Sequence, residues 1–252
     1  MGDVRVEAAD RVMVITFDRA SKRNAITDEM YGEVAAALIH AATDDDIRVA
    51  VLAGDGADFC AGNDISMFAD SAAGKGDIAE SNVGPFLNAL STFPKPLVAI
   101  VSGRAIGVGV TMLLHCDLVY VATDAQLTLP FVDLGLVPEA GSAWLLPQRI
   151  GHARAFALIA LGERLSGTDA AALGLANVAL PTDELAPAAM AAARTLAGKP
   201  PSALAATKKL MRDSAAIEAA MAADREAFLA QLATPEAAAA FAAFAGRKNA
   251  TT

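Results

Sequence analysis

The chain has 252 residues, enough for one large core or for one core with a small appended unit. A hydrophobic fraction of 54% and a charged fraction of 19% are typical of a globular protein, and the formal net charge of -9 excludes the basic face that broad nucleic-acid binding requires. The most apolar stretch, residues 96–121, is interrupted by Arg104, His115 and Asp117 and so predicts no membrane span.

The N-terminal residues and the cysteines indicate the cellular compartment of the protein and its redox state. The first residues contain no apolar signal core. The only cysteines, Cys60 and Cys116, have neither metal-type nor CxxC spacing. We therefore expect a reduced, cytoplasmic protein with no metal site.

Short apolar or alternating runs predict the β-strands. In chain order they lie at residues 4–7, 12–17, 49–53, 97–101, 118–122 and 126–129. Helical patterns lie at residues 27–42, 86–93 and 107–115, and again from residue 184 onward. Thr27, Ser142 and Thr168 are expected helix caps. The recurring order of strand, strand and helix predicts an α/β fold. The tail from about residue 200 has apolar faces with nothing left in the chain to cover them all, which predicts oligomerisation.

Three segments with glycines can carry chemistry. Residues 58–65 form a turn after a strand, residues 103–111 form a glycine-rich helix start, and residues 134–142 hold Glu139 in a glycine/proline loop. Small residues expose backbone N–H groups, which suit an anion that appears transiently, such as a thioester enolate. Tight packing alone also explains such glycines. Neither glycine segment has the spacing of a phosphate loop or a dinucleotide fingerprint.

In their order and spacing the three segments resemble the enoyl-CoA hydratase/isomerase (crotonase) family. The likeness covers nearly the whole chain, from residues 19–25 through 59–65, 107–109, 116–118 and 165–175 to the helical end. It implies a crotonase-type spiral of ββα repeats over residues 1–195 that carries the acyl-CoA site, and a C-terminal helical oligomerisation region over residues 196–252. It further implies a homotrimer or a dimer of trimers, with coenzyme A as part of the substrate and no other cofactor.

The resemblance also assigns roles to particular positions. The backbone N–H groups of Asn63 and Val108 would form an oxyanion hole. Valine departs from the glycine that is usual in the family, but a backbone donor survives any side chain except proline. The residues expected to bind substrate and coenzyme A are Lys22, Arg23, Ala25, Ala61, Gly62, Asn63, Asp64, Ile65, Gly107 and Val108. Further candidates for the phosphates are Lys208, Lys209, Arg247 and Lys248.

The two glutamates with which hydratases of this family position water have no counterpart in the sequence. Their places are taken by Thr111, too weak a base, and Phe131, which has no proton to exchange. Glu139 instead resembles the acidic residue of the branch that converts 3-enoyl-CoA to 2-enoyl-CoA with one base. An apolar pocket would raise its pKa and exclude water. The expected walls of that pocket are Phe68, Phe131, Leu136 and Trp144.

Several alternatives stay open at the level of sequence. Glu139 could be a surface carboxylate, Asp133 is a second-choice acid, and His115 is interpreted as a packing residue. The alternatives to an isomerase are an enoyl-CoA hydratase of fatty-acid degradation, another reaction on the same oxyanion hole, or a catalytically inactive acyl-CoA-binding homologue. A buried Glu139 would favour an enzyme, and a solvent-facing Glu139 would favour the binding protein.

Overall fold

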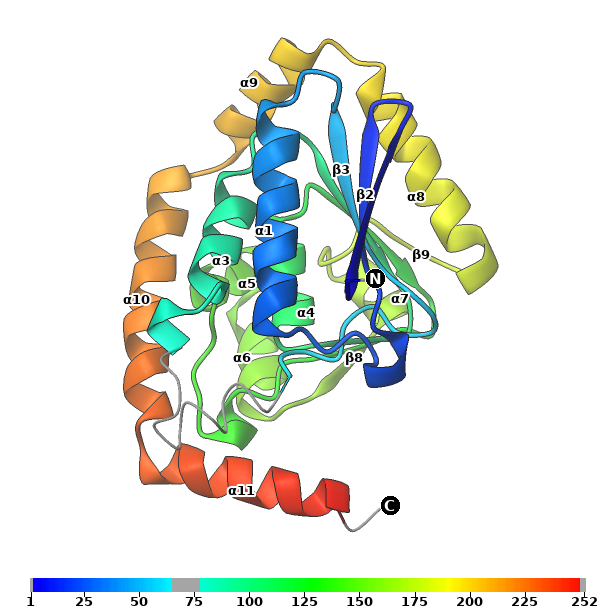
Figure 1. Ribbon diagram of the computed structural model, residues 1–252. Helices are drawn as coiled ribbons and strands as arrows, with labels where there is room; N and C mark the ends of the chain where they lie inside the picture. Colours follow the sequence, from blue (N-terminus) through cyan, green and yellow to red (C-terminus); the bar gives the residue numbers. More distant parts are fainter. Residues whose placement is uncertain (1, 65–77, 250–252) are drawn as a thin grey trace.

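A computed structural model describes residues 2–64 and 78–249 (Figure 1). Ile65 and Phe68, both expected in the site, lie outside these residues. Within them, no helix is both long enough and apolar enough to cross a membrane.

Two sheets form the centre of the molecule. Among the described residues, the larger has six strands in the order β1-β2-β3-β4-β6-β9, and the smaller has three in the order β5-β7-β8. The strands of the larger sheet are β1 (Val4–Ala9), β2 (Val12–Phe17), β3 (Val49–Gly54), β4 (Leu97–Val101), β6 (Leu118–Ala122) and β9 (Val178–Leu180). Those of the smaller sheet are β5 (Arg104–Ile106), β7 (Gln126–Thr128) and β8 (Arg164–Ser166). β1 and β2 form an antiparallel hairpin, and the other pairs in the larger sheet are parallel.

The predicted repeat of strand, strand and helix is confirmed. β4 lies in the larger sheet and β5 in the smaller one, and the chain then enters α4 (Val108–Thr111) and η3 (Met112–His115). β6 and β7 repeat this step and lead to η4 (Val132–Leu134) and α5 (Ser142–Ile150). From β4 to β7 successive strands alternate between the two sheets, so this part of the chain winds as a spiral.

Helices cover both faces of the larger sheet (Figure 1). On one side α1 (Asp28–Thr43) and α3 (Val83–Thr92) lie next to each other, and on the other side lies α8 (Thr182–Ala197). Side chains alternate along a strand, so Val49 and Val51 of β3 pack with alanines of α8, while Leu52 belongs to the larger core on the α1 side. The short helices not yet named are η1 (Ala20–Lys22), η2 (Ile78–Glu80), α6 (His152–Ala160) and α7 (Gly167–Ala172).

Of the three predicted helix caps, one is confirmed. The side chain of Thr27 accepts a hydrogen bond from the N–H of Met30 and caps α1. The predictions for Ser142 and Thr168 are wrong. α5 begins after Gly141, whose φ of 71° turns the chain into the helix, and α7 is capped by Ser166, two residues before Thr168.

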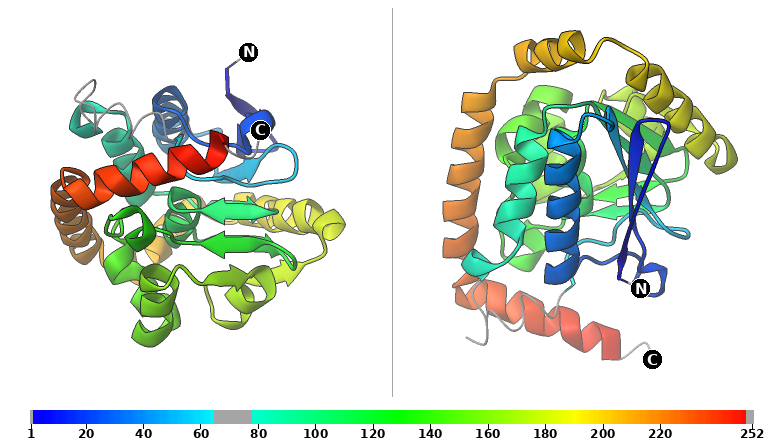
Figure 2. Two further views of the ribbon diagram at one scale, coloured as in Figure 1. Left: turned by 90° about the horizontal axis from the view of Figure 1, so that it is seen from below. Right: turned by 45° about the horizontal axis from the view of Figure 1, so that its top comes forward.

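The C-terminal tail wraps around its own chain. α9 (Pro201–Met211) leads into α10 (Ser214–Leu232), which packs against α3 and α5, and α11 (Pro235–Asn249) crosses one end of the molecule near η4 (Figures 1 and 2). The core therefore covers part of the apolar surface of the tail. Leu210 and Met211 at the end of α9 are 88% and 81% exposed. The boundary expected at residue 195 falls in the last turn of α8.

Candidate functional site

The first two glycine-containing segments lie side by side. The N–H of Cys60 donates to the carbonyl of Arg104 at 3.0 Å, and the N–H of Ile106 donates back to the carbonyl of Cys60 at 2.9 Å. A Cβ atom at Gly109 would stand only 2.8 Å from the Cys60 carbonyl oxygen, so glycine permits this close approach. The pairing holds the turn at Asn63 next to the helix start at Val108.

The two expected oxyanion donors are the backbone N–H groups of Asn63 and Val108. Among the described residues, neither the N–H of Asn63 nor that of Val108 donates to a backbone carbonyl. Asn63 and Ile26 form an isolated parallel β-bridge, whose hydrogen bonds are made by the neighbours of Asn63. The N–H of Ile26 donates to the carbonyl of Gly62, and the N–H of Asp64 donates to the carbonyl of Ile26, each at 2.8 Å. Val108 is the first residue of α4, where an N–H has no partner within the helix.

Glu139 is a buried carboxylate on the loop that precedes α5. Its side chain lines a cavity although the residue is only 7% exposed. Within the described part of the chain, its Oε1 atom has no hydrogen-bond partner. Burial, and then the negative charge of Asp224, raise the pKa of Glu139 to about 7. Such a carboxyl group can both accept and return a proton near neutral pH.

Asp224 on α10 is a second buried carboxylate, and reasoning from the sequence missed it. Its Oδ2 accepts a hydrogen bond from the N–H of Ala143 at 3.4 Å, so it holds the start of α5. Burial raises the pKa of Asp224 to about 6, although hydrogen bonds from the backbone N–H groups of residues 141–143 act in the opposite direction. No local motif marks this aspartate within its alanine-rich helix.

A cavity of about 770 Å³ extends from Asn63 and Glu139 along the space between α3 and the tail. Its size is that of a pocket for a substrate or cofactor. Its apolar lining includes Val83, Leu87, Ile217, Met221 and Phe228, and its polar lining includes Asn88, Thr92, Lys209, Arg212 and Arg225. The tail therefore supplies one wall of the site.

The aromatic and aliphatic walls expected from the sequence lie elsewhere. Phe131 and Leu136 are buried in the core, and Trp144 on α5 is 36% exposed. The structure places none of these three on the wall of the cavity. Thr111 is fully buried, and its hydroxyl donates weakly to the carbonyl of Val108 at 3.4 Å.

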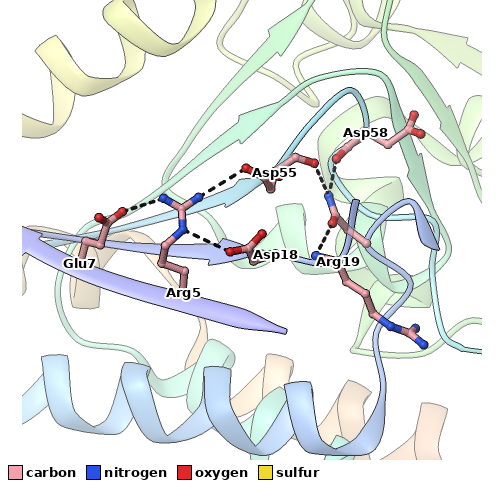
Figure 3. Close-up of polar contacts among 7 residues, drawn as sticks. Arg5, Glu7, Asp18, Arg19, Asp55 and Asp58 are labelled. Carbon is pink, nitrogen blue, oxygen red and sulfur yellow. Dashed lines mark hydrogen bonds and ion pairs between the residues drawn. The ribbon is translucent and has the colours of Figure 1, made fainter. Parts of the chain in front are cut away.

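The loop expected to bind coenzyme A is fastened to the Asn63 turn. Lys22 and Arg23 have exposed side chains, and the carbonyl of Arg23 accepts a hydrogen bond from the N–H of Ala61 at 3.0 Å. The buried side chain of Asn24, at a φ of 56°, donates to the carbonyls of Asp55 at 2.9 Å and Asp58 at 2.6 Å (Figure 3).

Ion pairs strengthen this attachment. Arg19 pairs with Asp64 at 2.7 Å. Arg5 on β1 forms ion pairs with Glu7, Asp18 and Asp55 (Figure 3). Residues 22–25 and 61–64 thus form one rim, joined by the Ala61–Arg23 hydrogen bond and by Arg19, which contacts the carbonyl of Ala25 and the carboxylate of Asp64.

The basic residues of the tail are not equivalent. Lys208 donates to Asp117 at 2.7 Å and to the carbonyl of Lys95 at 2.8 Å, so a carboxylate already neutralises its charge. Asp117 also accepts from the N–H of Leu97, the first residue of β4. Lys208, Lys209 and Arg212 all line the cavity, but of these three only Lys208 has a carboxylate partner among the described residues. The side chains of Arg247 and Lys248 lie outside the described part of the structure.

Comparisons with known proteins agree with the fold. The sequence profile of the family described as enoyl-CoA hydratase/isomerase matches residues 7–251. Enoyl-CoA delta isomerase 2 of Rattus norvegicus is 35% identical over 212 residues, which cover 83% of this chain and 54% of that protein, so the chain spans about half of that relative. The 2,3-dehydroadipyl-CoA hydratase of Escherichia coli is 32% identical over 241 residues, covering 94% of this chain and 92% of that protein.

Two solved structures are also similar. Pseudomonas aeruginosa OdaA superimposes with a TM-score of 0.91 at 41% identity, covering 97% of this chain and 99% of that chain. The enoyl-CoA hydratase/isomerase of Pseudoalteromonas atlantica T6c superimposes with a TM-score of 0.92 at 35% identity, covering 98% of each chain.

Proposed function

This chain belongs to the enoyl-CoA hydratase/isomerase family, and on that premise we propose that it converts 3-enoyl-CoA to 2-enoyl-CoA with Glu139 as its single acid–base group. The observation that carries the proposal is the position of Glu139, which lines the cavity while its buried Oε1 has no hydrogen-bond partner among the described residues. Thr111 and Phe131 stand where the family resemblance puts the water-activating glutamates of a hydratase, and neither can activate water.

The reaction needs one proton to leave C2 and to return at C4. Ionised Glu139 takes the proton from C2, and the electron pair of that C–H bond moves into the conjugated system. The negative charge then collects on the thioester oxygen, where the N–H groups of Asn63 and Val108 stabilise it. Neutral Glu139 returns the proton to C4, and the double bond now joins C2 and C3. No atom enters or leaves the substrate.

The electrostatics of Glu139 support this role. A base is most effective when its pKa lies near the working pH, and burial with the nearby charge of Asp224 raises the pKa of Glu139 to about 7. In the same proposal, coenzyme A contacts the rim formed by residues 22–25 and 61–64. The active assembly is a homotrimer or a dimer of trimers, and it works in the cytoplasm.

Hydration of 2-enoyl-CoA is the second candidate function. The Escherichia coli relative that aligns with nearly the whole chain is named as a hydratase. In addition, the negative charge of Asp224 raises the pKa of Glu139, so a second carboxyl group acts electrostatically on the first. A hydratase would use such a pair to hold and deprotonate water.

Product identification separates the two reactions. The protein is incubated with 3-enoyl-CoA and, separately, with 2-enoyl-CoA, and the products are analysed by chromatography and mass spectrometry. Isomerisation leaves the substrate mass unchanged, whereas hydration adds the mass of one water molecule. Rapid hydration of 2-enoyl-CoA without isomerisation would overturn the proposal.

Variants then test the choice of base. Glu139→Gln keeps the shape of the side chain but removes the base, so isomerisation should fall by ~100-fold or more while binding of a saturated acyl-CoA persists. Thr111→Ala is the matched control, because its hydroxyl is assigned no proton transfer. If Glu139→Gln isomerises at nearly the rate of the unmodified protein while Thr111→Ala or Asp133→Asn is inactive, Glu139 is not the base.

A further inference from the structure

His115 is a buried polar residue between the Glu139 loop and the C-terminal tail. It has no exposed surface, and its Nε2 lies 2.8 Å from the carbonyl oxygen of Ala140. Its Nδ1 lies 3.3 Å from the guanidinium of Arg212, which also donates to the carbonyl of His115 at 3.2 Å. Every polar atom of the imidazole ring thus has a partner.

These partners determine the tautomer of the ring. A carbonyl oxygen can only accept, so Nε2 carries the hydrogen, and a guanidinium can only donate, so Nδ1 is the bare acceptor. The ring is therefore neutral. Burial is the main reason that the pKa of His115 falls to about 4. The charges of Arg212, Arg149 and Lys208 act in the same direction, while the Ala140 hydrogen bond opposes them.

The loop that His115 contacts has an unfavourable backbone conformation. Ala140 has a φ of 61° and Gly141 a φ of 71°, so two successive residues are left-handed, and one of them carries a Cβ atom. Such a conformation persists only where surrounding contacts impose it. The hydrogen bond from His115 to the Ala140 carbonyl is a contact of this kind.

The direction of the Glu139 carboxyl group depends on this backbone. Its Oε1 has no partner among the described residues, so no hydrogen bond holds that oxygen in place. Glu139 directly precedes Ala140, and its own carbonyl accepts from the N–H of Ser142 at 3.0 Å across the same turn. A change at Ala140 therefore moves the carboxyl group relative to a bound acyl chain.

We propose that His115 is a positioning residue for the Glu139 base. Its Nε2–H bond to Ala140, supported from the tail by Arg212, keeps the carboxyl group aimed at the reacting carbons. His115 is not a catalytic residue, because its ring is neutral and it is not among the described residues that line the cavity. The inference rests on the proposed function of Glu139.

Three substitutions at position 115 test the inference. In His115→Gln the amide can donate to Ala140 and accept from Arg212, as the imidazole does. In His115→Asn the shorter side chain can accept a hydrogen bond from Arg212 but does not reach the carbonyl of Ala140. His115→Leu makes neither hydrogen bond. Because a displacement of about 1 Å can cost about 100-fold in rate, we expect kcat for isomerisation to fall by ~10- to 100-fold in the Leu and Asn variants. KM should stay within ~2-fold, and kcat of His115→Gln within ~3-fold of the unmodified protein.

Two further readouts separate positioning from other roles. Calorimetric binding of a saturated acyl-CoA and the thermal unfolding temperature show whether a slow variant is folded and binds. If His115→Leu does not fold, the Gln and Asn variants decide the question. The pH at which kcat/KM is half-maximal should be the same in His115→Gln as in the unmodified protein. Loss of that transition would identify His115 as the titrating base and overturn the inference.

The remaining outcomes are distinguishable from a failure of the proposed function. If Glu139→Gln is inactive but His115→Leu has unchanged kcat, the positioning role alone is wrong. Equal loss of kcat in the Gln and Asn variants also overturns it, because only Gln can bond to Ala140. If Glu139→Gln remains active, the proposed function fails regardless of the results at position 115.

Discussion

The rate of isomerisation should follow the ionisation of Glu139. The base must be ionised to remove the C2 proton, and burial with the charge of Asp224 raises its pKa to about 7. The ionised fraction of such a group increases from about one tenth at pH 6 to about nine tenths at pH 8, so kcat/KM should increase about tenfold over this interval. The direction follows from the role: a general base gains activity as the pH rises through its pKa.

A charge variant of the neighbouring carboxylate tests the cause of the shift. Asp224→Asn removes the negative charge that raises the pKa of Glu139, so the midpoint of the profile should move to lower pH. Its amide oxygen can still accept the hydrogen bond from the N–H of Ala143. Asp183→Asn is the matched control, since it changes net charge equally at an exposed position on α8. Its midpoint should not move.

The assay follows the absorbance of the conjugated 2-enoyl thioester at substrate concentrations far below KM, in buffers of constant ionic strength. Under these conditions the profile reports ionisations of the free enzyme. A flat profile would refute Glu139 as the base. So would a profile in which activity falls as the pH rises. A midpoint that is the same in Asp224→Asn and Asp183→Asn would show that the Asp224 charge does not act on the base.

Further predictions concern stability and assembly. Ionising Glu139 opposes folding above its ordinary pKa of 4.5, so urea unfolding should show Glu139→Gln to be more stable by about 3 kcal/mol above pH 7, with the difference vanishing toward pH 4. Asn24→Ala leaves the carbonyls of Asp55 and Asp58 without their donor. Thermal unfolding should therefore show that the free energy of unfolding is lower by about 2–4 kcal/mol. Sedimentation should show a trimer or hexamer, because Leu210 and Met211 are exposed; a stable monomer at micromolar concentration would contradict this.

The longer strands were predictable from the sequence, whereas β5, β8 and β9, of three residues each, were not expected. The expected strands at residues 97–101 and 118–122 coincide with β4 and β6. These short runs lie between two covering layers, where a continuous apolar run that contains several β-branched residues favours a strand. Helix starts were less predictable. Gly141 rather than Ser142 precedes α5, because a left-handed turn imposed by tertiary contacts, not a side-chain cap, begins that helix.

In the site, the local features could be predicted and the long-range ones could not. The free N–H groups of Asn63 and Val108 follow from turns of a few residues, which a motif can encode. The walls of the cavity follow from how the tail packs, and Ile217 or Met221 look like any other apolar residues of an alanine-rich helix. The sequence therefore suggested nearby large side chains, such as Trp144, in their place.

Asp224 and Arg212 show why the tail matters to the proposed chemistry. If the tail served only for assembly, its polar residues would have no reason to meet the Glu139 loop. Instead Asp224 holds the start of α5 and raises the pKa of Glu139, and Arg212 binds the histidine that contacts Ala140. The tail also supplies one wall of the cavity. In the proposed mechanism the spiral provides the oxyanion donors and the base, and the tail sets the charge state and direction of that base, so both regions are needed for catalysis.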